Sequence, residues 1–590
     1  MAKASETDAT ARPKSGPKGS PKGSLGNRFA MWRARRAAPV TGFASQPEPR
    51  TIGLYSRGKQ LMSGNFMASG HLIAAPDRPI WEVAAANSEF EQEAHGFGWL
   101  DDLAAVGDQA AKARAQDWLW QWIALYGKGQ GPGWTPDLTG RRLIRWINHG
   151  FFVLTTRDKA QSDAYYNSLS AQVVFLSWRW PHAAPGLPRF EALTGLISAG
   201  LALTGLKSRV APAVTALALE CDNEIDALGG ISTRNPEELL EVFTLLTWAE
   251  RALAEAGLVA PRALLQAQER IAPTLRALRH ADGGLARFHG GGRGTEGRLD
   301  QALSSAGIKP TVLGAHSFGM GFARLAGGRT TLVVDAKAPP DAKAGLYAHA
   351  STTAMELTSG RRPLVVNCGT GTPFGPEWHK AGRATASHST LSIDGYSSSR
   401  LGAGAQGDIL VDRAQVHDLH QSTLHEGQHL SLAHNGWSGT HGLLHRRDLT
   451  LSIDGRKLSG AEFLGPTTQA EQDRFEQLLS HGKLQGIAFS VRFHLHPDVD
   501  SRLDMGGNAV SMALKSGEIW VFRHDGRLKL SLDTSVYLEK GRLKPRGSKQ
   551  IVLSGRAHEL ETLVGWTLAK AQDTPLAIRD LDRDDLHASL

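Results

Sequence analysis

The chain has 590 residues and a net charge of +8, with 41% apolar and 21% charged residues. This length exceeds what one hydrophobic core supports, and the composition is that of a globular protein, so a fibrous or wholly disordered chain is excluded. The two cysteines, Cys221 and Cys368, exclude a disulfide framework, and the apolar runs are too short to predict a transmembrane helix.

The excess positive charge lies at the N-terminus, because residues 1–50 carry a net charge of +7 and the remaining residues about +1. The Lys, Pro, Gly and Ser content of residues 1–49 predicts a disordered basic tail. Such a tail would suit an acidic surface, but it is more often only a solvated leader, so we expect no nucleic acid partner. The tail lacks the apolar core of a secretory signal, which predicts a cytoplasmic protein.

Residues 50–315 show apolar spacings of three and four, which predict helices with short connections. The clearest helical segments are 110–127, 140–156, 164–180, 190–206, 236–257 and 261–281. Asn235 is placed to cap the fifth of these helices, and Pro236 suits its first turn. Because no strand pattern intervenes, this segment predicts an all-α domain of paired helices, an α/α toroid.

Residues 316–590 follow a different pattern, since the apolar period changes to two near Ser317. The clearest strand segments are 445–465, 486–497, 517–539 and 549–557, divided by turns that contain Gly. This pattern predicts a large antiparallel β-sandwich. The expected architecture is therefore a multidomain α+β chain, with the helical toroid first and the β-sandwich second.

Candidate site residues lie between residues 345 and 396. Two apolar runs on either side of Gly360 predict a β-hairpin. His349, Asn367 and His388 flank the predicted strands, where a sheet brings separate side chains into one cleft. The alternative, that they are ordinary polar residues at strand ends, is left open by their spacing.

The segments AHASTTAMELTSGRRPLVVNCGTG and RATASHSTLSIDG resemble the C-terminal signature of the heparinase II/III family of polysaccharide lyases. His349, Asn367 and His388 fall on the family's polar positions, and the resemblance extends over about residues 53–566. It implies β-elimination on an anionic polysaccharide or oligosaccharide that contains uronic acid. It also implies a location in the periplasm or cell envelope, as an alternative to the cytoplasm.

This chemistry needs a group that neutralises the uronate carboxylate, a base for the C5 proton and an acid for the departing oxygen. Among the residues of this chain, Arg234 and Asn235 would neutralise the carboxylate, since a guanidinium suits a carboxylate bidentately. Tyr347 or His349 would be the base, and the other of the two or His388 would be the acid. The alternative for Arg234 and Asn235 is a helix cap with a structural ion pair.

Four further residues are expected to bind the substrate. Trp178 and Trp180 would stack on sugar rings, or would belong to the core of the helical domain. Asp282 and His289 precede the expected domain junction and would reach the cleft. No cofactor is certain.

Some members of the family hold zinc on a His–Asp–His set. His349, Asn367 and His388 would hold zinc or another divalent cation at the matching positions, although a neutral amide is a poorer ligand than a carboxylate.

The chain departs from the family pattern in its helical half. The expected Asn-His pair is absent at residues 187–190, and the expected Tyr-His pair is absent at residues 229–236. Two hypotheses follow. The first is a lyase that cleaves an anionic polysaccharide with an altered site, and the second is a non-enzymatic glycan-binding or scaffold protein of the same fold.

Overall fold

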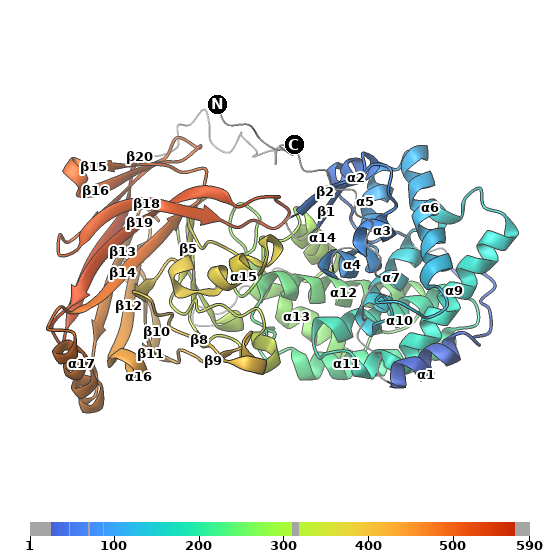
Figure 1. Cartoon of the computed structure of the whole chain (residues 1–590), viewed down its shortest axis with the longest axis horizontal. Coiled ribbons are helices and arrows are strands. Elements are labelled where there is room, and N and C mark those ends of the chain that lie inside the picture. Colours follow the sequence, from blue (N-terminus) through green and yellow to red (C-terminus); the bar gives the residue numbers. More distant parts are fainter. Residues whose placement is uncertain (1–24, 46–47, 69–70, 86–87, 310–317, 573–590) are drawn as a thin grey trace, which may run out of the picture.

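A computed structural model describes residues 25–45, 48–68, 71–85, 88–309 and 318–572. The chain forms a helical domain followed by a β domain, and the two lie next to each other along the long axis of the molecule (Figure 1). The predicted order of a helical toroid and an antiparallel β-sandwich is confirmed. The predicted boundary at residues 315 and 316, and the change of period near Ser317, lie outside the described residues.

The helices of the first domain are short to medium in length and pack in pairs, with α10 against α7, α11 and α12. They are α1 (Leu25–Ala34), α2 (Tyr55–Met62), α3 (Ile80–Ala84), α4 (Ser88–His95), α5 (Gly98–Val106), α6 (Gln109–Tyr126), α7 (Pro136–Asn148), α8 (Gly150–Leu154), α9 (Lys159–Arg179), η1 (Trp180–His182), α10 (Leu187–Ala202), η2 (Lys207–Arg209), α11 (Val210–Glu224), α12 (Pro236–Glu255), α13 (Arg262–Ala277) and α14 (Arg298–Ser305). Tryptophans interlock their core, as in the edge-to-face pair of Trp122 and Trp146.

Two predictions for the first half of the chain are wrong. The tail is not disordered up to residue 49, because α1 packs on α9 and buries Ala30 and Ala34. Residues 1–24 of the predicted tail lie outside the described residues. The helical domain also contains a hairpin, β1 (Asn65–Ala68) paired with β2 (His71–Ala74), where no strand was expected.

The second domain contains two large antiparallel sheets. One has the strand order β10-β11-β12-β13-β20-β17-β16-β15, and the other has the order β18-β19-β14-β6-β5-β4-β3, with β7 also paired to β14. A helix, α17, is inserted between β13 and β14 and was not expected from the sequence.

The elements of this domain follow in chain order. They are η3 (Gly319–Gly321), β3 (Phe322–Gly327), β4 (Thr330–Asp335), η4 (Ala342–Gly345), β5 (Met355–Ser359), β6 (Arg362–Val366), η5 (Thr372–Phe374), α15 (Pro376–Arg383), η6 (Thr385–Ser387), β7 (Leu391–Ile393), β8 (Arg400–Leu401), η7 (Gly404–Gln406), β9 (Leu410–Asp412), β10 (Val416–Leu424), β11 (Gly427–Trp437), α16 (Ser438–His441), β12 (Leu443–Ser452), β13 (Lys457–Gly465), α17 (Gln469–His481), β14 (Ile487–Leu495), β15 (Asp500–Asp504), η8 (Met505–Gly507), β16 (Ala509–Ala513), β17 (Ile519–His524), β18 (Lys529–Tyr537), β19 (Arg546–Ala557) and β20 (Thr562–Gln572).

The junction of the two domains is packed with both apolar and charged contacts. Phe322, Val333 and Ala354 of the β domain belong to the hydrophobic core of the helical domain. The turn between β18 and β19 also reaches the helical domain, where Lys540 Nζ lies 2.5 Å from Glu237 Oε2. The two domains are therefore joined by a continuous interface, on which the candidate site is built.

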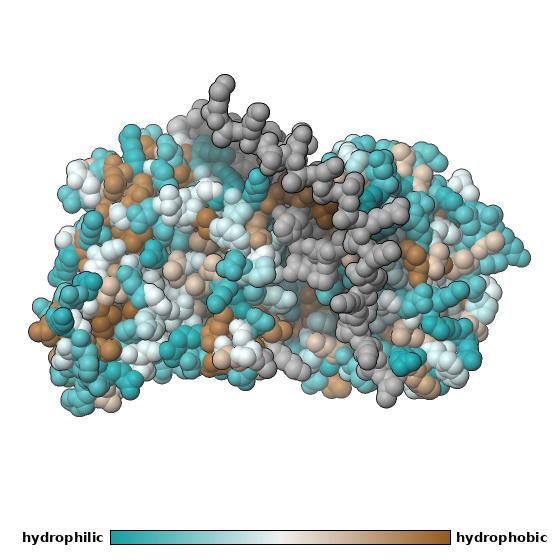
Figure 2. Space-filling model, viewed as in Figure 1, coloured by the Kyte–Doolittle hydropathy of each residue, from teal (hydrophilic) through white to brown (hydrophobic). Residues whose placement is uncertain are grey.

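On the face seen in Figure 2, hydrophilic and hydrophobic residues are interspersed over both domains. None of the helices in the described part of the chain has the length and apolar character needed to cross a membrane.

Candidate functional site

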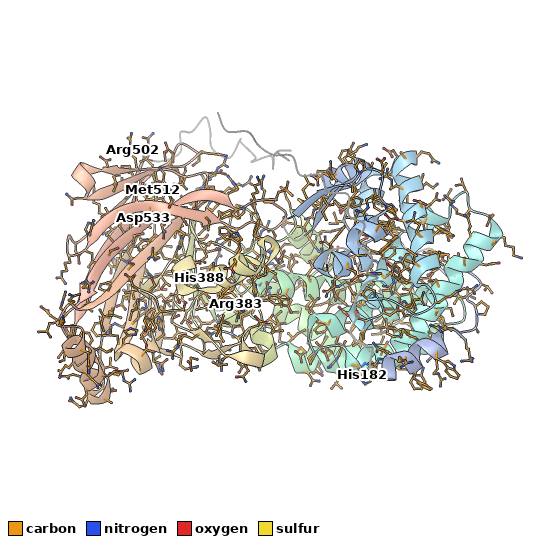
Figure 3. All side chains as sticks on the ribbon, in the orientation of Figure 1. His182, Arg383, His388, Arg502, Met512 and Asp533 are labelled. Atoms are coloured by element: carbon orange, nitrogen blue, oxygen red, sulfur yellow. The ribbon has the colours of Figure 1, made fainter. Side chains whose placement is uncertain are left out.

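His349 and His388 meet at the end of the β domain that faces the helical domain. Figure 3 labels His388 beside Arg383, close to the junction. The Nδ1 of His388 lies 2.8 Å from the carbonyl oxygen of Ala384, which accepts only, so this nitrogen carries the hydrogen. The Nε2 of His388 therefore accepts from His349 Nδ1, 3.0 Å away. The prediction that these two histidines come together is correct.

His289 extends this group toward a carboxylate. Its Nδ1 accepts from the backbone NH of His349 at 3.2 Å, so its hydrogen lies on Nε2, 3.4 Å from Asp335 Oδ2. The Ser351 hydroxyl donates to the same oxygen at 2.7 Å. Asp335, at the end of β4, is fully buried and is the acceptor at the centre of this network.

Arg234 provides the positive charge that balances Asp335. Its Nη2 lies 2.5 Å from Asp335 Oδ1, and its other donors are directed at carbonyl oxygens of the β domain. Those oxygens belong to Met320, Gly321, Lys337 and Ala338. Arg234 is 4% exposed. The predicted role in neutralising a uronate is therefore wrong for this side chain, and the alternative of a structural ion pair is confirmed.

Asn235 is a helix cap. Its Oδ1 accepts from the backbone NH groups of Glu237 and Glu238 at 3.0 and 3.2 Å, which satisfies two free donors at the start of α12. The predicted N-cap is confirmed, and the alternative role at a substrate carboxylate is not supported by this geometry.

Burial controls the protonation of the network. It lowers the pKa of His388 to about 4 and, together with the neighbouring charge of His388, holds the pKa of His349 well below its ordinary value. Burial alone would raise the pKa of Asp335, but Arg234 and His289 outweigh it, so the pKa lies below the ordinary range. Near neutral pH the network therefore holds one ion pair and neutral imidazoles.

Asn367 lies beside the two histidines but does not complete a metal site. Its Oδ1 accepts from the backbone NH of Ser389 at 2.9 Å, and its Nδ2 faces Glu356 Oε1 at 3.4 Å. No group of three or more His, Cys, Asp or Glu side chains in the described residues is placed to hold a metal ion. With its only side-chain oxygen bonded and the two imidazoles bonded to each other, this donor set does not fit zinc or another divalent cation.

Tyr347 is the exposed member of the predicted site. The residue is 55% exposed, and its ring contacts the ring of His379 with centroids 5.9 Å apart. On the other side it approaches Gly290, where an added Cβ would come within 2.9 Å of the Tyr347 Cβ. Gly290 has φ of +83°, so this position favours glycine for two reasons. Tyr347 thus lies on the surface beside the domain junction.

The predicted sugar-binding residues do not gather at this site. Trp178 lies in the last turn of α9, and its ring stacks on Arg33 of α1 at 4.5 Å. Trp180 belongs to η1, whose labelled His182 lies in the helical domain, well apart from His388 (Figure 3). Asp282 accepts from Gly284 NH at 2.9 Å and pairs with Arg293 at 3.3 Å. Of the four predicted residues, only His289 joins the histidine group.

A second buried network lies under the first and was missed in the sequence. Arg447 donates to the carbonyl oxygens of Thr353 and Ser389 at 2.8 and 2.9 Å, and it pairs with Glu462 at 2.8 Å. Glu462 also accepts from His445 at 2.7 Å. Burial would raise the pKa of Glu462, but Arg447 and His445 lower it to about 2. The sequence did contain a sign of buried charge in the β domain. Arg447, Glu462 and Glu356 are charged residues that each lie within a strand segment predicted from its apolar pattern.

Comparison with known proteins supports the fold. Residues 314–567 match the family described as Heparinase II/III-like, C-terminal. Among solved structures, heparinase III superimposes with a TM-score of 0.64 at 12% identity, over 92% of this chain and 89% of the other. A heparan sulfate lyase HepC mutant from Pedobacter heparinus has a TM-score of 0.57 at 14% identity, over 93% and 88%. The chain therefore has a heparinase II/III-like C-terminal domain on the fold of the polysaccharide lyases.

One relative that matches over nearly the whole chain is named for its localisation and not for an enzymatic activity. FtsZ-localized protein C from Caulobacter vibrioides (strain NA1000 / CB15N) is 28% identical over 549 residues, which cover 90% of this chain and 91% of the relative. The chain is therefore similar in fold to proteins named for cleavage of a polysaccharide and in sequence to a protein named for its localisation.

Proposed function

We propose that this heparinase II/III-like chain is a non-enzymatic scaffold protein that associates with FtsZ. The observation that carries the proposal is the burial of the side chains that a lyase would turn toward its substrate. Arg234, His349 and His388 are each less than 5% exposed. The donors of Arg234 and both ring nitrogens of His388 are bonded within the protein, and Nδ1 of His349 is bonded to His388.

The chemistry of β-elimination explains why this burial matters. A lyase must neutralise the uronate carboxylate and place a base at the C5 proton. The donors of Arg234 are directed at Asp335 and at backbone carbonyls. The lowered pKa of His388 leaves its imidazole neutral near pH 7, so it would be a poor general acid. The two pairs that the family resemblance implies are also absent from their expected positions, at residues 187–190 and 229–236.

The name of the relative supports the second part of the proposal. FtsZ-localized protein C aligns with both domains of this chain, since the match covers 90% of its residues. We infer that this chain likewise associates with FtsZ and that the lyase fold serves as a rigid body on which a binding surface is displayed.

Two measurements on the purified full chain test the proposal. Binding to purified FtsZ is measured by biolayer interferometry, and elimination is measured by the ultraviolet absorbance of an unsaturated uronate. The substrate panel is heparan, chondroitin, alginate and bacterial exopolysaccharides. We expect FtsZ binding and no absorbance change. Absorbance that rises with the wild-type chain and is lost in both His349→Ala and His388→Ala would overturn the proposal, as would the absence of FtsZ binding.

A lyase remains the second candidate, and the exposure of Tyr347 favours it. The phenol is on the surface at the domain junction, with His379 against its ring, where a base could meet an anionic polysaccharide or oligosaccharide. The test is Tyr347→Phe with Tyr396→Phe as the matched control, because Tyr396 is similarly exposed at 48%. This candidate requires an absorbance signal that only the first variant removes.

A further inference from the structure

A pocket opens in the helical domain, among elements that do not contribute to the histidine network. It lies between α2, α4, α5 and β1, which gather at one end of the helical domain (Figure 1). The space that the centres of water-sized molecules can occupy is about 40 Å³, and the pocket is open to solvent at its mouth. This room holds a few waters, or the end of a short alkyl chain that displaces them.

One wall of the pocket is apolar. Ile80, Phe90 and Trp99 line it and are each at most 6% exposed. Trp99 Nε1 donates to the carbonyl oxygen of Ala94 at 3.0 Å, so its only hydrogen-bond donor is used within the protein. Met67 of β1 also lines the pocket. This wall offers hydrocarbon and ring surface to a ligand and no free donor from the indole.

The polar part of the pocket has more negative than positive charge. Asp102, Glu93 and Arg57 line it. Asp102 Oδ1 accepts from the backbone NH of Leu54 at 2.8 Å, which leaves Oδ2 available. Within the described residues, no lysine, arginine or histidine lies at ion-pair distance from either carboxylate. Two carboxylates and one guanidinium leave the pocket one positive charge short of balance.

The protonation of the two carboxyls agrees with this deficit. Loss of solvent raises the pKa of Asp102 to about 6, and Arg57 opposes the rise only in part. Loss of solvent also raises the pKa of Glu93, although this residue is exposed at the rim. A cation placed between these groups would stabilise both ionised forms, because an opposite charge nearby favours the charged state.

We propose that this pocket binds a protonated alkylamine, with its ammonium group at Asp102 and Glu93 and its alkyl chain against Phe90 and Trp99. An ammonium group suits the site because it is a compact charge with three donors that can reach two carboxylates from one side. The same chemistry is found in a free diamine and in a lysine side chain of a partner protein. The apolar wall requires that the charge be carried on a hydrocarbon chain.

Isothermal titration calorimetry of the full chain at pH 7.5 tests this inference. The probes are n-butylammonium and 1,5-diaminopentane, with n-butanol and butyrate as matched neutral and anionic compounds. We expect both amines to bind at least about tenfold more tightly than butanol and butyrate. A fifth probe, N-acetyl-lysine methylamide, distinguishes the sources, since a pocket for a partner's lysine should bind it more tightly than the free diamine.

Variants connect the binding to the pocket. Asp102→Asn keeps the acceptor for Leu54 NH, and Glu93→Gln changes an exposed residue, so both should fold. Each should weaken amine binding by at least about tenfold. Glu82→Gln is the control, because Glu82 is an exposed carboxylate on α3 that pairs with Arg78. Equal binding of butanol and butylammonium, unchanged binding in Asp102→Asn, or no heat from either amine would overturn the inference.

Discussion

Replacing Asp335 with asparagine tests whether the buried network holds the two domains together. The substitution keeps the shape of the side chain but removes the charge that balances Arg234, which is itself 4% exposed. Removing one partner of a buried ion pair typically costs about 3–5 kcal/mol, because the remaining charge is left uncompensated. Arg234 retains its carbonyl acceptors in the β domain, so we expect a loss near the lower end, about 3 kcal/mol.

The assay is urea denaturation followed by circular dichroism and tryptophan fluorescence. The control is Asp341→Asn, because Asp341 forms an exposed ion pair with Arg413 that should contribute no more than about 1 kcal/mol. The double variant Arg234→Met with Asp335→Asn should lose less stability than the sum of the single variants, since it leaves no unpaired charge. A loss below about 1 kcal/mol in Asp335→Asn, or strict additivity, would refute the reasoning.

Three further predictions concern titration and reactivity. Unfolded histidine binds a proton near pH 6.5 but folded His388 only near pH 4, so stability should fall as pH drops between these values, by about 3 kcal/mol from this group. His388→Gln should flatten that slope in a series of urea titrations, and an unchanged slope would contradict the assignment. The effect of Asp102 on the pH dependence of stability has the opposite sign. Its pKa in the folded chain is about 6, above the ordinary value of 3.8, so the stability that this carboxyl contributes is lost as pH rises through this range. Asp102→Asn should therefore raise the melting temperature at pH 7.5 and leave it nearly unchanged at pH 4, whereas equal effects at both values would show that charge is not the cause. Cys221 and Cys368 are buried, and burial raises their pKa values to about 12 and about 11, so neither should react with a thiol reagent until the chain unfolds. Rapid labelling of the native chain would contradict this expectation.

Much of the fold could be predicted because it depends on local patterns. The change of apolar period separates the two domains, and Asn235 with Pro236 marks the start of α12. The hairpin around Gly360 was also found, since β5 and β6 flank it. Helix α1 was missed because its stability comes from packing on α9, about 130 residues further along the chain, rather than from its own composition.

The site was predictable only in part, because its character depends on long-range contacts. His349 and His388 could be found since each lies a few residues before a strand of the same sheet, β5 and β7 respectively. The role of Arg234 could not be predicted, because its partner Asp335 lies 101 residues away along the chain and only the folded structure shows that both are buried. A sequence pattern indicates which side chains can carry charge, but burial decides whether that charge meets a ligand or another residue of the same chain.

The shared network has a consequence for how the molecule can be dissected. The helical half supplies Arg234 and His289, and the β half supplies Asp335 and His349. A helical fragment produced alone would expose a cation with no counter-charge, and a β fragment would expose a carboxylate with none. We therefore expect that neither domain alone reproduces the binding properties of the intact protein. Partners should be mapped with point variants of the full chain.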